Sequence, residues 1–425
     1  MSAIRIGNCS GFYGDRLSAM REMLEGGPLD VLTGDYLAEL TMLILGRDQM
    51  RDPALGYAKT FVRQAEQCLG TALEQGVRIV SNAGGLNPAG LGAKLREVAQ
   101  GLGLDPQIAV IRGDNLMPKA AELGFGDALT ANAYLGGFEI AEALAEGADV
   151  VVTGRVTDAS LVVGPAIWWH GWTPEQYDEL AGAVVAGHVI ECGAQATGGN
   201  FSGFTSQSVP MGLPLGFPLV ELAHDGSCVV TKHPGTAGQV TIDTVTAQLM
   251  YEIQGPTYLN PDVSVDLTSI HLRSEGPDRV AIEGVRGSSP PPSLKVCINT
   301  LGGFRNQVEF VLVGLEIEEK AAWVQGQLEA LLAATRPAEV AWSMGGLPQP
   351  DADTEEAAST VIRCVVKDPS ADIVGRAFSA AAVELALASY PGFTMTAPPG
   401  AATPYGVYRA AYVERSVVEP EVVFA

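Results

Sequence analysis

The segment Gly154-Arg-Val-Thr-Asp158 brings a cation, a hydroxyl and a carboxylate together directly after the most apolar strand that the sequence predicts, residues 150–152. An arginine there needs an anionic partner, because burying it unpaired carries a large energetic penalty. Asp158 would serve in a local ion pair that caps the next helix. Alternatively, Arg155 clamps a substrate carboxylate or phosphate, while Thr157 and Asp158 cap the helix or place a proton. The position favours a ligand, since the carboxyl edge of a parallel sheet faces the binding crevice.

A glycine-rich turn follows another predicted strand and leads into a helix that begins near residue 88 or 89. Free amide N–H groups at such a helix start suit a phosphate or carboxylate. The turn is not a P-loop, because Lys94 does not stand in a GK[ST] arrangement, and no GxGxxG follows the first strand. The alternative is a turn that lets helix and sheet pack closely. As an anion site it would use Ser81, Asn82, Gly84, Gly85 and Asn87.

Glu191-Cys-Gly-Ala-Gln195 follows an apolar helix predicted over residues 174–189 and opens a glycine-rich segment. Glu191 is a candidate general acid or base beside a loop that could close over a ligand, with Gln195 as a ligand contact. The alternative is a solvent-facing glutamate at a helix end. Residues 196–204 likewise allow two interpretations, a lid or a rigid turn.

The segment Thr231-Lys-His-Pro-Gly-Thr236 places two potential cations before a glycine turn. We predict Lys232 and Thr236 as anion contacts and His233 as a group that titrates near neutral pH. The alternative is a hairpin tip with solvated ends. The other histidines lack the spacing of a metal site.

Polar residues at the remaining strand ends extend this list of candidates. Asn8, Ser10 and Asp35 follow the first two predicted strands and are candidate substrate contacts, although they could simply shape turns. Carboxylates at these ends could gather around Mg²⁺, which binds a few oxygen ligands, and the sequence leaves metal use open. The carboxylates in question are Asp15, Asp35, Asp114 and Asp158. Nucleophilic catalysis has little support, since there is no G-x-S-x-G elbow and Cys9 and Cys192 fit buried thiols.

Five predicted strands within the first 160 residues end in a small residue followed by a polar one, and helix-like segments precede four of them. Strands separated by helices must run parallel. We therefore predict an α/β fold, with a parallel-sheet domain over residues 1–220 whose strand ends bind the ligand. Short β-like runs, turns and later helices predict a second, smaller α+β domain over residues 221–425 that completes the cleft.

The composition is that of a folded globular protein, with 425 residues of which 47% are hydrophobic and 18% charged. A net charge of −23 argues against nucleic acid or an anionic membrane as a partner and is compatible with a homo-oligomer. Six scattered cysteines without a C-x-x-C pair predict neither a zinc site nor a disulfide framework. We expect a cytoplasmic protein, because the chain shows no signal-peptide run and no transmembrane run of about 18 apolar residues.

Several separate strings carry a resemblance to a known family. They are residues 8–15 (NCSGFYGD), 35–39 (DYLAE), 81–88 (SNAGGLNP), 154–158 (GRVTD), 191–195 (ECGAQ) and 390–393 (YPGF). The chain is similar to the acyclic terpene utilisation AtuA family over almost its whole length, without the additional small C-terminal domain that many members carry. The resemblance implies a setting of acyl-CoA catabolism, beside carboxylases and hydratases that process branched isoprenoid acids. It implies no particular reaction.

These features lead to the hypothesis of an enzyme that processes a small branched acyl substrate, either a CoA thioester or a carboxylic acid. Lyase, hydratase or isomerase chemistry fits best, with Arg155, Asp158, Glu191 and His233 sharing one cleft. The sequence requires no cofactor, and coenzyme A enters only as part of the substrate. The alternative is a non-catalytic subunit that binds an acyl-CoA or a partner enzyme.

Overall fold

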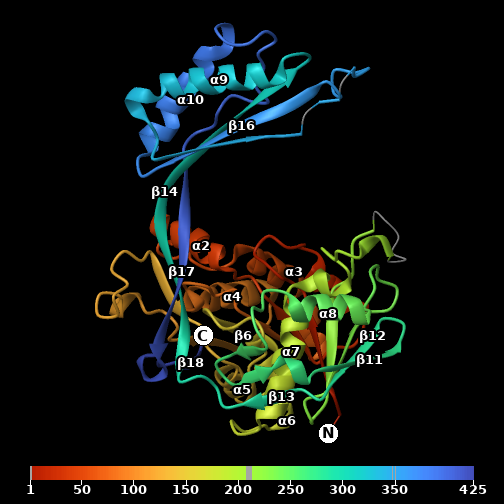
Figure 1. Ribbon diagram of the computed structural model, residues 1–425. Coiled ribbons are helices and arrows are strands. Elements are labelled where there is room, and N and C mark those ends of the chain that lie inside the picture. The colour runs from red at the N-terminus through yellow and green to blue at the C-terminus, as the bar shows by residue number, and fades with distance from the viewer. Residues whose placement is uncertain (1, 207–212, 347, 350) are drawn as a thin grey trace. The chain divides into compact units, whose positions relative to one another are not determined.

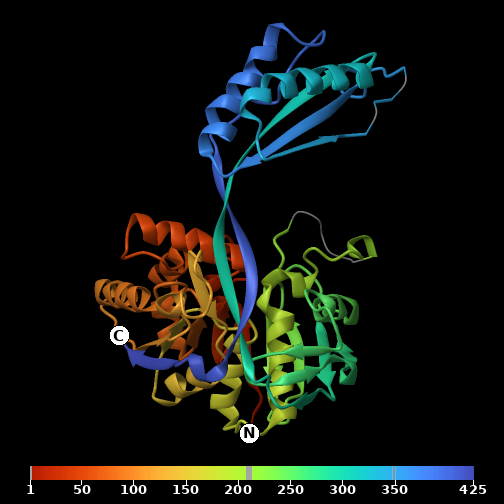
Figure 2. The same ribbon diagram turned by 60° about the vertical axis from the view of Figure 1, so that its left-hand side comes forward.

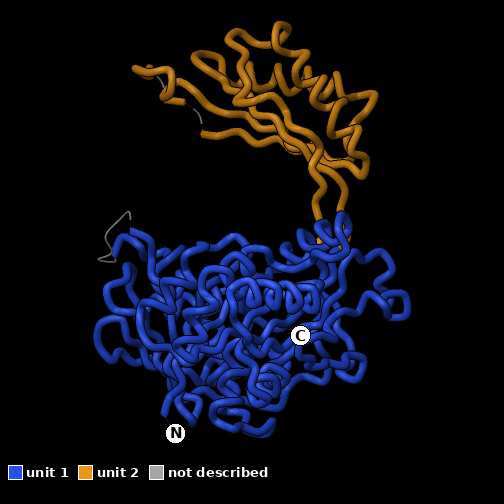
Figure 3. Tube along the Cα trace, turned by 180° about the vertical axis from the view of Figure 1, so that it is seen from behind, with its two compact units in different colours: residues 1–299, 408–425 blue, residues 300–407 orange. Residues whose placement is uncertain are grey.

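The computed structural model describes residues 2–206, 213–346, 348–349 and 351–425. These residues form two compact units (Figure 3). Unit 1 comprises residues 1–299 and 408–425, and unit 2 comprises residues 300–407. The chain crosses between the units twice, once in strand β14 (Ser293–Val313) and once in strand β17 (Thr403–Glu414). These two strands are neighbours in one sheet and run alongside each other (Figure 2).

Unit 1 is built on a ten-stranded mixed sheet. Its strands, in spatial order, are β11 (His271–Gly276), β12 (Arg279–Glu283), β8 (Cys228–Lys232), β7 (Pro218–Leu222), β1 (Ile4–Asn8), β2 (Val31–Gly34), β3 (Arg78–Ser81), β6 (Val150–Thr153), β4 (Ile108–Arg112) and β18 (Glu421–Phe424). The five strands from β1 to β4 in this order are mutually parallel. β7 pairs with β1 in the antiparallel sense, and β18 does the same with β4. The carboxyl ends of five parallel strands therefore meet at one edge.

Helices cover both faces of this sheet because its central strands are apolar on both sides. Val151 belongs to one buried cluster and Val150 and Val152 to another. The first cluster takes in α5 (Phe138–Ala145), α6 (Ser160–His170) and α7 (Tyr177–Glu191), whereas the second takes in α1 (Ala19–Gly26), α3 (Lys59–Gln75) and α4 (Pro88–Leu102). Figure 1 shows α3 and α4 on one side of β6, and α5 and α6 on the other.

The expected helices of the first half follow from local signals that the structure reproduces. α3 and α4 each end at a glycine with positive φ, Gly76 at 70° and Gly103 at 71°, a conformation that glycine adopts without a steric penalty. α4 begins with Pro88 after Asn87, whose side chain accepts a hydrogen bond from the Gly90 N–H. α7 is buried along its length from residue 180 to 191, so its last residue is held inside the protein.

The rest of unit 1 includes α2 (Glu39–Arg51), α8 (Ile242–Met250), strand β5 (Thr130–Ala133), which pairs with β14, and a small sheet. The small sheet contains β13 (Arg286–Ser288), β10 (Ser264–Asp266) and β9 (Thr257–Leu259). In unit 2, β15 (Glu339–Met344) and β16 (Ser359–Asp368) pair beside the later half of β14. Helices α9 (Ile317–Leu331) and α10 (Phe378–Glu384) pack with these strands around Phe310 and Phe378, which are fully buried.

The predicted α/β class is confirmed, although the sheet is mixed rather than purely parallel. The expected domain boundary at residues 220 and 221 falls inside β7, and the two compact units divide the chain elsewhere. The physical reason is that β7 hydrogen-bonds to β1, and β8 hydrogen-bonds to β7. Both strands therefore extend the sheet that the first half of the chain forms. Among the described residues, no helix is long and apolar enough to cross a membrane.

The glycine turn after β3 is tightly packed, which makes Gly84 a test of its role. A Cβ on Gly84 would lie 2.4 Å from the Thr153 carbonyl oxygen and 2.6 Å from Pro88 Cβ. We expect Gly84→Ala to lower the free energy of unfolding by about 1–3 kcal/mol, measured by urea denaturation, because backbone atoms of β6 cannot move aside. Gly101→Ala at the end of α4 is the control, since a Cβ there would have no atom within 4 Å and alanine favours the helix. An unchanged stability of Gly84→Ala would contradict the packing role.

Candidate functional site

A cavity of about 410 Å³ lies in unit 1 where several strands and helices end. It is lined by residues that follow β1, β2 and β6, by the end of α7 and the segment after it, and by the two residues after α8. The lining residues are Gly11, Phe12, Asp15, Asp35, Leu37, Ala38, Glu39, Arg155, Asp158, Glu191, Cys192, Ala194, Gln195, Gly199, Asn200, Tyr251 and Glu252. The cavity thus occupies the sheet edge at which the sequence predicts a ligand.

Three carboxyl groups converge in this cavity from three different elements. Asp35 follows β2, Asp158 follows β6, and Glu191 is the last residue of α7. One oxygen of each lies within 4.8 Å of one oxygen of both others. Asp35 and Glu191 are buried, whereas the Asp158 side chain is 29% exposed. We call these three residues the carboxylate triad.

Two asparagines hold two members of the triad, Asp35 and Glu191, in place. Asn82, which follows β3, donates from Nδ2 to Asp35 Oδ1 at 2.7 Å, and the Leu37 N–H donates to the same oxygen at 2.9 Å. Asn8, at the end of β1, donates to the carbonyl oxygens of Ile190 and Glu191 at 2.7 and 2.8 Å. Asn8 therefore satisfies carbonyls at the end of α7 that have no partner within the helix. These bonds fix the backbone position from which the Glu191 side chain extends.

Arg155 is the one cation among the described residues that line the cavity, and it is only 2% exposed. Its Nη1 donates to the Leu37 carbonyl at 2.8 Å and to Asp158 Oδ1 at 3.0 Å, and its guanidinium carbon lies 4.3 Å from the Tyr134 ring centroid. The predicted local ion pair with Asp158 is therefore present. The predicted helix cap is not, because the N-cap of α6 is Ala159, which makes no side-chain cap bond.

The cavity crowds together carboxyl groups that are buried or half-buried. Burial and the nearby carboxylate of Asp158 raise the pKa of Asp35 well above its ordinary value, against the opposing influence of Arg155. Burial, Asp158 and Asp35 likewise raise the pKa of Glu191. Burial is also the main cause of the raised pKa of Glu252, which Asp158 and Glu39 increase further. Carboxyl groups crowded in this way resist ionising together.

The structure brings together three of the four predicted catalytic residues, and Gln195 lines the same cavity. His233 lies elsewhere, which corrects the expectation of a single cleft. Its ring packs against Gly26 and Gly27, where no Cβ fits beside it, and its Nε2 lies 3.0 Å from the Met23 carbonyl oxygen. His233 is thus a packed histidine between α1 and the end of β8, and its burial lowers its pKa.

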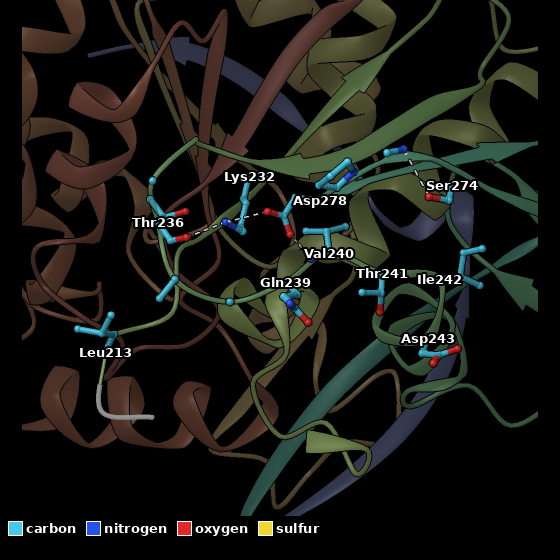
Figure 4. A pocket seen from close by; sticks show the side chains of 15 residues that line it. Leu213, Lys232, Thr236, Gln239, Val240, Thr241, Ile242, Asp243, Ser274 and Asp278 are labelled. Carbon is cyan, nitrogen blue, oxygen red and sulfur yellow. Dashed lines mark hydrogen bonds and ion pairs between the residues drawn. The ribbon is translucent and has the colours of Figure 1, made fainter. Parts of the chain in front are cut away.

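Lys232 and Thr236 line a second cavity of about 760 Å³ (Figure 4). Lys232 Nζ donates to the Thr236 carbonyl at 2.7 Å and forms an ion pair with Asp278 at 3.2 Å. Both contacts appear as dashed lines in Figure 4. The lysine charge is thus already matched by an internal carboxylate, so the expected phosphate contact has no free cation at this position.

The glycine turn after β3 does not line the cavity that holds the carboxylate triad, which we call the carboxylate cavity, and its backbone N–H groups are largely occupied. Those of Ala83, Gly85, Leu86, Asn87 and Gly90 all donate to oxygens of the protein. Ser81 donates to the Gly34 carbonyl, and Asn87 donates to the carbonyls of Ala54 and Leu55. These contacts favour the packing interpretation of the turn over the anion site.

The remaining candidates shape the backbone around the cavity. Ser10 donates to the Phe12 carbonyl, and Thr157 lies 2.6 Å from the Ser160 hydroxyl. Asp114 accepts from the Arg155 N–H and from Asn132, and burial raises its pKa to about 6. It does not line the cavity, so it does not join the carboxylates that do.

Sequence reasoning missed Glu39, Tyr134 and Glu252. Glu39 stands in the string that follows β2, accepts a hydrogen bond from the Tyr134 hydroxyl at 2.8 Å, and lines the cavity. Glu252 has a φ of 62°, a left-handed conformation that costs free energy in a residue with a side chain. No local sequence signal announces that conformation.

Charge crowding makes a prediction about stability. A carboxyl whose pKa is raised by folding binds its proton more tightly in the folded state, so its contribution to stability falls as pH rises toward the raised pKa. In buffer free of divalent cations, we expect Glu191→Gln to raise the free energy of unfolding by about 1 kcal/mol or more at pH 8, and by less at pH 5. Urea denaturation at both pH values measures this. Glu122→Gln, at an exposed position, should change little, and a destabilised Glu191→Gln would refute the crowding argument.

Comparisons with known proteins bear on the family. The model of the acyclic terpene utilisation family protein AtuA matches residues 4–424, nearly the whole chain. The comparison with curated proteins found no match. Two solved structures of homoserine dehydrogenase from S. aureus, at pH 6.5 and pH 7.0, align at 10% and 11% identity over 91% of this chain and 83% of theirs, with TM-scores of 0.16 and 0.15. Scores that low carry no structural argument. The extent of the family match shows that this chain belongs to the acyclic terpene utilisation AtuA family.

Proposed function

We propose that the protein is an enzyme that uses acid and base groups in the carboxylate cavity to act on a small branched acyl substrate, either a CoA thioester or a carboxylic acid. The reaction class is a lyase, hydratase or isomerase. The observation that carries the proposal is the convergence of Arg155, Asp158 and Glu191, together with Asp35, in one cavity. Family membership supports the substrate class, because it implies involvement in acyclic terpene utilisation and acyclic terpenes are branched hydrocarbon chains.

The cavity has the size and the groups that such chemistry needs. Its volume of about 410 Å³ falls in the usual range for small-ligand pockets and suits an acyl group. Moving a double bond, or adding water across one next to a carbonyl, requires a base that takes a proton from carbon or water and an acid that returns one. Several carboxyl groups face one small volume here, so both roles can be filled from within the cavity.

Arg155 supplies the electrostatic part of the proposal. Loss of a proton beside a carbonyl places negative charge on the carbonyl oxygen, and a fixed cation in a dry site lowers the free energy of that state. The guanidinium is held by the Leu37 carbonyl, Asp158 and the Tyr134 ring, so it needs no rearrangement as charge develops. Asp158, which is the most exposed member of the carboxylate triad, is the group best placed to exchange protons with a bound substrate, either directly or through a water that it holds.

The proposal is tested with a panel of branched unsaturated and 3-hydroxy acids, each as free acid and as CoA thioester. Incubation in D₂O with mass spectrometry should detect deuterium incorporation or the mass change of water addition or loss. We expect Asp158→Asn to lower the rate by about 10²- to 10⁴-fold, the usual contribution of a general acid or base. Asp243→Asn is the matched control, because this exposed aspartate lines the second cavity.

Two outcomes count against the catalytic role. Full turnover by a folded Asp158→Asn variant would exclude that carboxylate from the reaction. Tight binding of an acyl-CoA without any deuterium or mass change, in the wild-type chain and the variant alike, would favour the alternative, a non-catalytic subunit that binds an acyl-CoA or a partner enzyme.

A further inference from the structure

We propose that the carboxylate triad of Asp35, Asp158 and Glu191 binds a divalent cation of the oxygen-preferring kind, Mg²⁺ or Mn²⁺, within the cavity. One oxygen from each residue lies within 4.8 Å of the other two. Oxygens bound to one octahedral Mg²⁺ at about 2.1 Å lie about 3 Å apart when adjacent and about 4.2 Å apart when opposite. The triad therefore closes around an ion after a small movement, which Asp158 can make because it is partly exposed.

Glu191 provides the observation that is independent of the spacing. The residue is only 8% exposed and lines the cavity, yet its carboxylate has only the weak thiol donor of Cys192 as a hydrogen-bonding neighbour in the described part of the chain. Buried carboxylates normally accept several strong hydrogen bonds, because desolvation is otherwise uncompensated. Its oxygen instead faces two other carboxyl groups. A cation at the centre of the triad supplies the missing compensation.

The guanidinium of Arg155 does not occupy the centre of the triad. Arg155 Nη1 pairs with Asp158, and among the described residues no ion pair joins Arg155 to Asp35 or to Glu191. In the described residues, no hydrogen bond joins any two members of the triad. The three carboxyl groups therefore do not share a proton through a direct contact. The triad offers oxygen ligands only, a set that suits Mg²⁺ and Mn²⁺ better than metals that select nitrogen or sulfur ligands.

The cation resolves a difficulty in the proposed function, on which this inference rests. Among the described residues, six carboxyl groups and one guanidinium line the cavity, so an acyl carboxylate or a developing enolate would meet mostly repulsion there. The carboxyl groups are Asp15, Asp35, Glu39, Asp158, Glu191 and Glu252. A divalent ion held by three of them leaves coordination positions for a substrate oxygen and for water, and polarises the bound carbonyl beside Arg155.

Direct titration tests the site without any substrate. The full chain is stripped of metal with EDTA, dialysed, and titrated with MnCl₂ while free Mn²⁺ is followed by electron paramagnetic resonance. We expect one Mn²⁺ per chain, displaced by excess MgCl₂ and accompanied by a rise in the thermal unfolding temperature, because the ion binds the folded state. Glu191→Gln and Asp35→Asn should each weaken Mn²⁺ binding at least about tenfold, whereas Asp243→Asn should bind as the wild type does.

The outcomes separate the cation site from the proposed function. Absence of Mn²⁺ binding at millimolar concentration, or unchanged binding by Glu191→Gln whose circular dichroism matches the wild type, overturns the cation site. Full turnover of an acyl substrate by the metal-stripped chain in EDTA overturns the part that the cation is given in the reaction, while leaving the proposed function intact. Specific Mn²⁺ binding that depends on Glu191, in a chain that converts no acyl substrate, keeps the cation site and overturns the proposed function.

Discussion

The buried guanidinium of Arg155 is the interaction on which the geometry of the cavity depends. Its side chain bonds the Leu37 carbonyl after β2 and Asp158 after β6, and it stacks on Tyr134 after β5. Its backbone N–H donates to Asp114 after β4. One residue thus ties together the ends of four strands. Removing this charge would leave the Leu37 carbonyl and the half-buried Asp158 carboxylate without their partner, and breaking such an interaction is costly even where its net contribution to stability is small.

Around this centre, the fold places polar groups in two layers that do different work. Asp35, Asp158 and Glu191 face the cavity, while Asn8 and Asn82 lie behind them and fix the end of α7 and the Asp35 carboxylate. An asparagine suits this second layer because its amide donates a hydrogen bond without adding charge to a site already crowded with carboxylates. The sequence identified all five residues as candidates, and their division into two layers comes from the tertiary contacts.

Local signals predicted most of the central sheet, since apolar strands, helix caps and positive-φ glycines act over a few residues. The same reasoning did not predict that β7 and β8 belong to the central sheet. Their short alternating runs are typical of an α+β domain, and nothing within them reveals that β7 pairs with β1, more than 200 residues earlier in the chain. The prediction that His233 lies in the same cleft as Arg155 was wrong for a related reason. Its fit against Gly26 and Gly27 depends on glycines that lie far from it in sequence.

Charge crowding and backbone strain meet in the same cavity, and their coincidence argues for a ligand. Asn200 and Glu252, both lining residues, adopt left-handed φ values of 56° and 62°. Asparagine adopts this conformation readily, but a glutamate such as Glu252 does so only where the surrounding structure enforces it, and such residues tend to collect at functional sites. If the cavity held water alone, the folded protein would be more stable with fewer carboxyl groups and a relaxed backbone there. Both costs become reasonable when a positively charged group binds at the centre of the triad, because it offsets the repulsion among the crowded carboxylates.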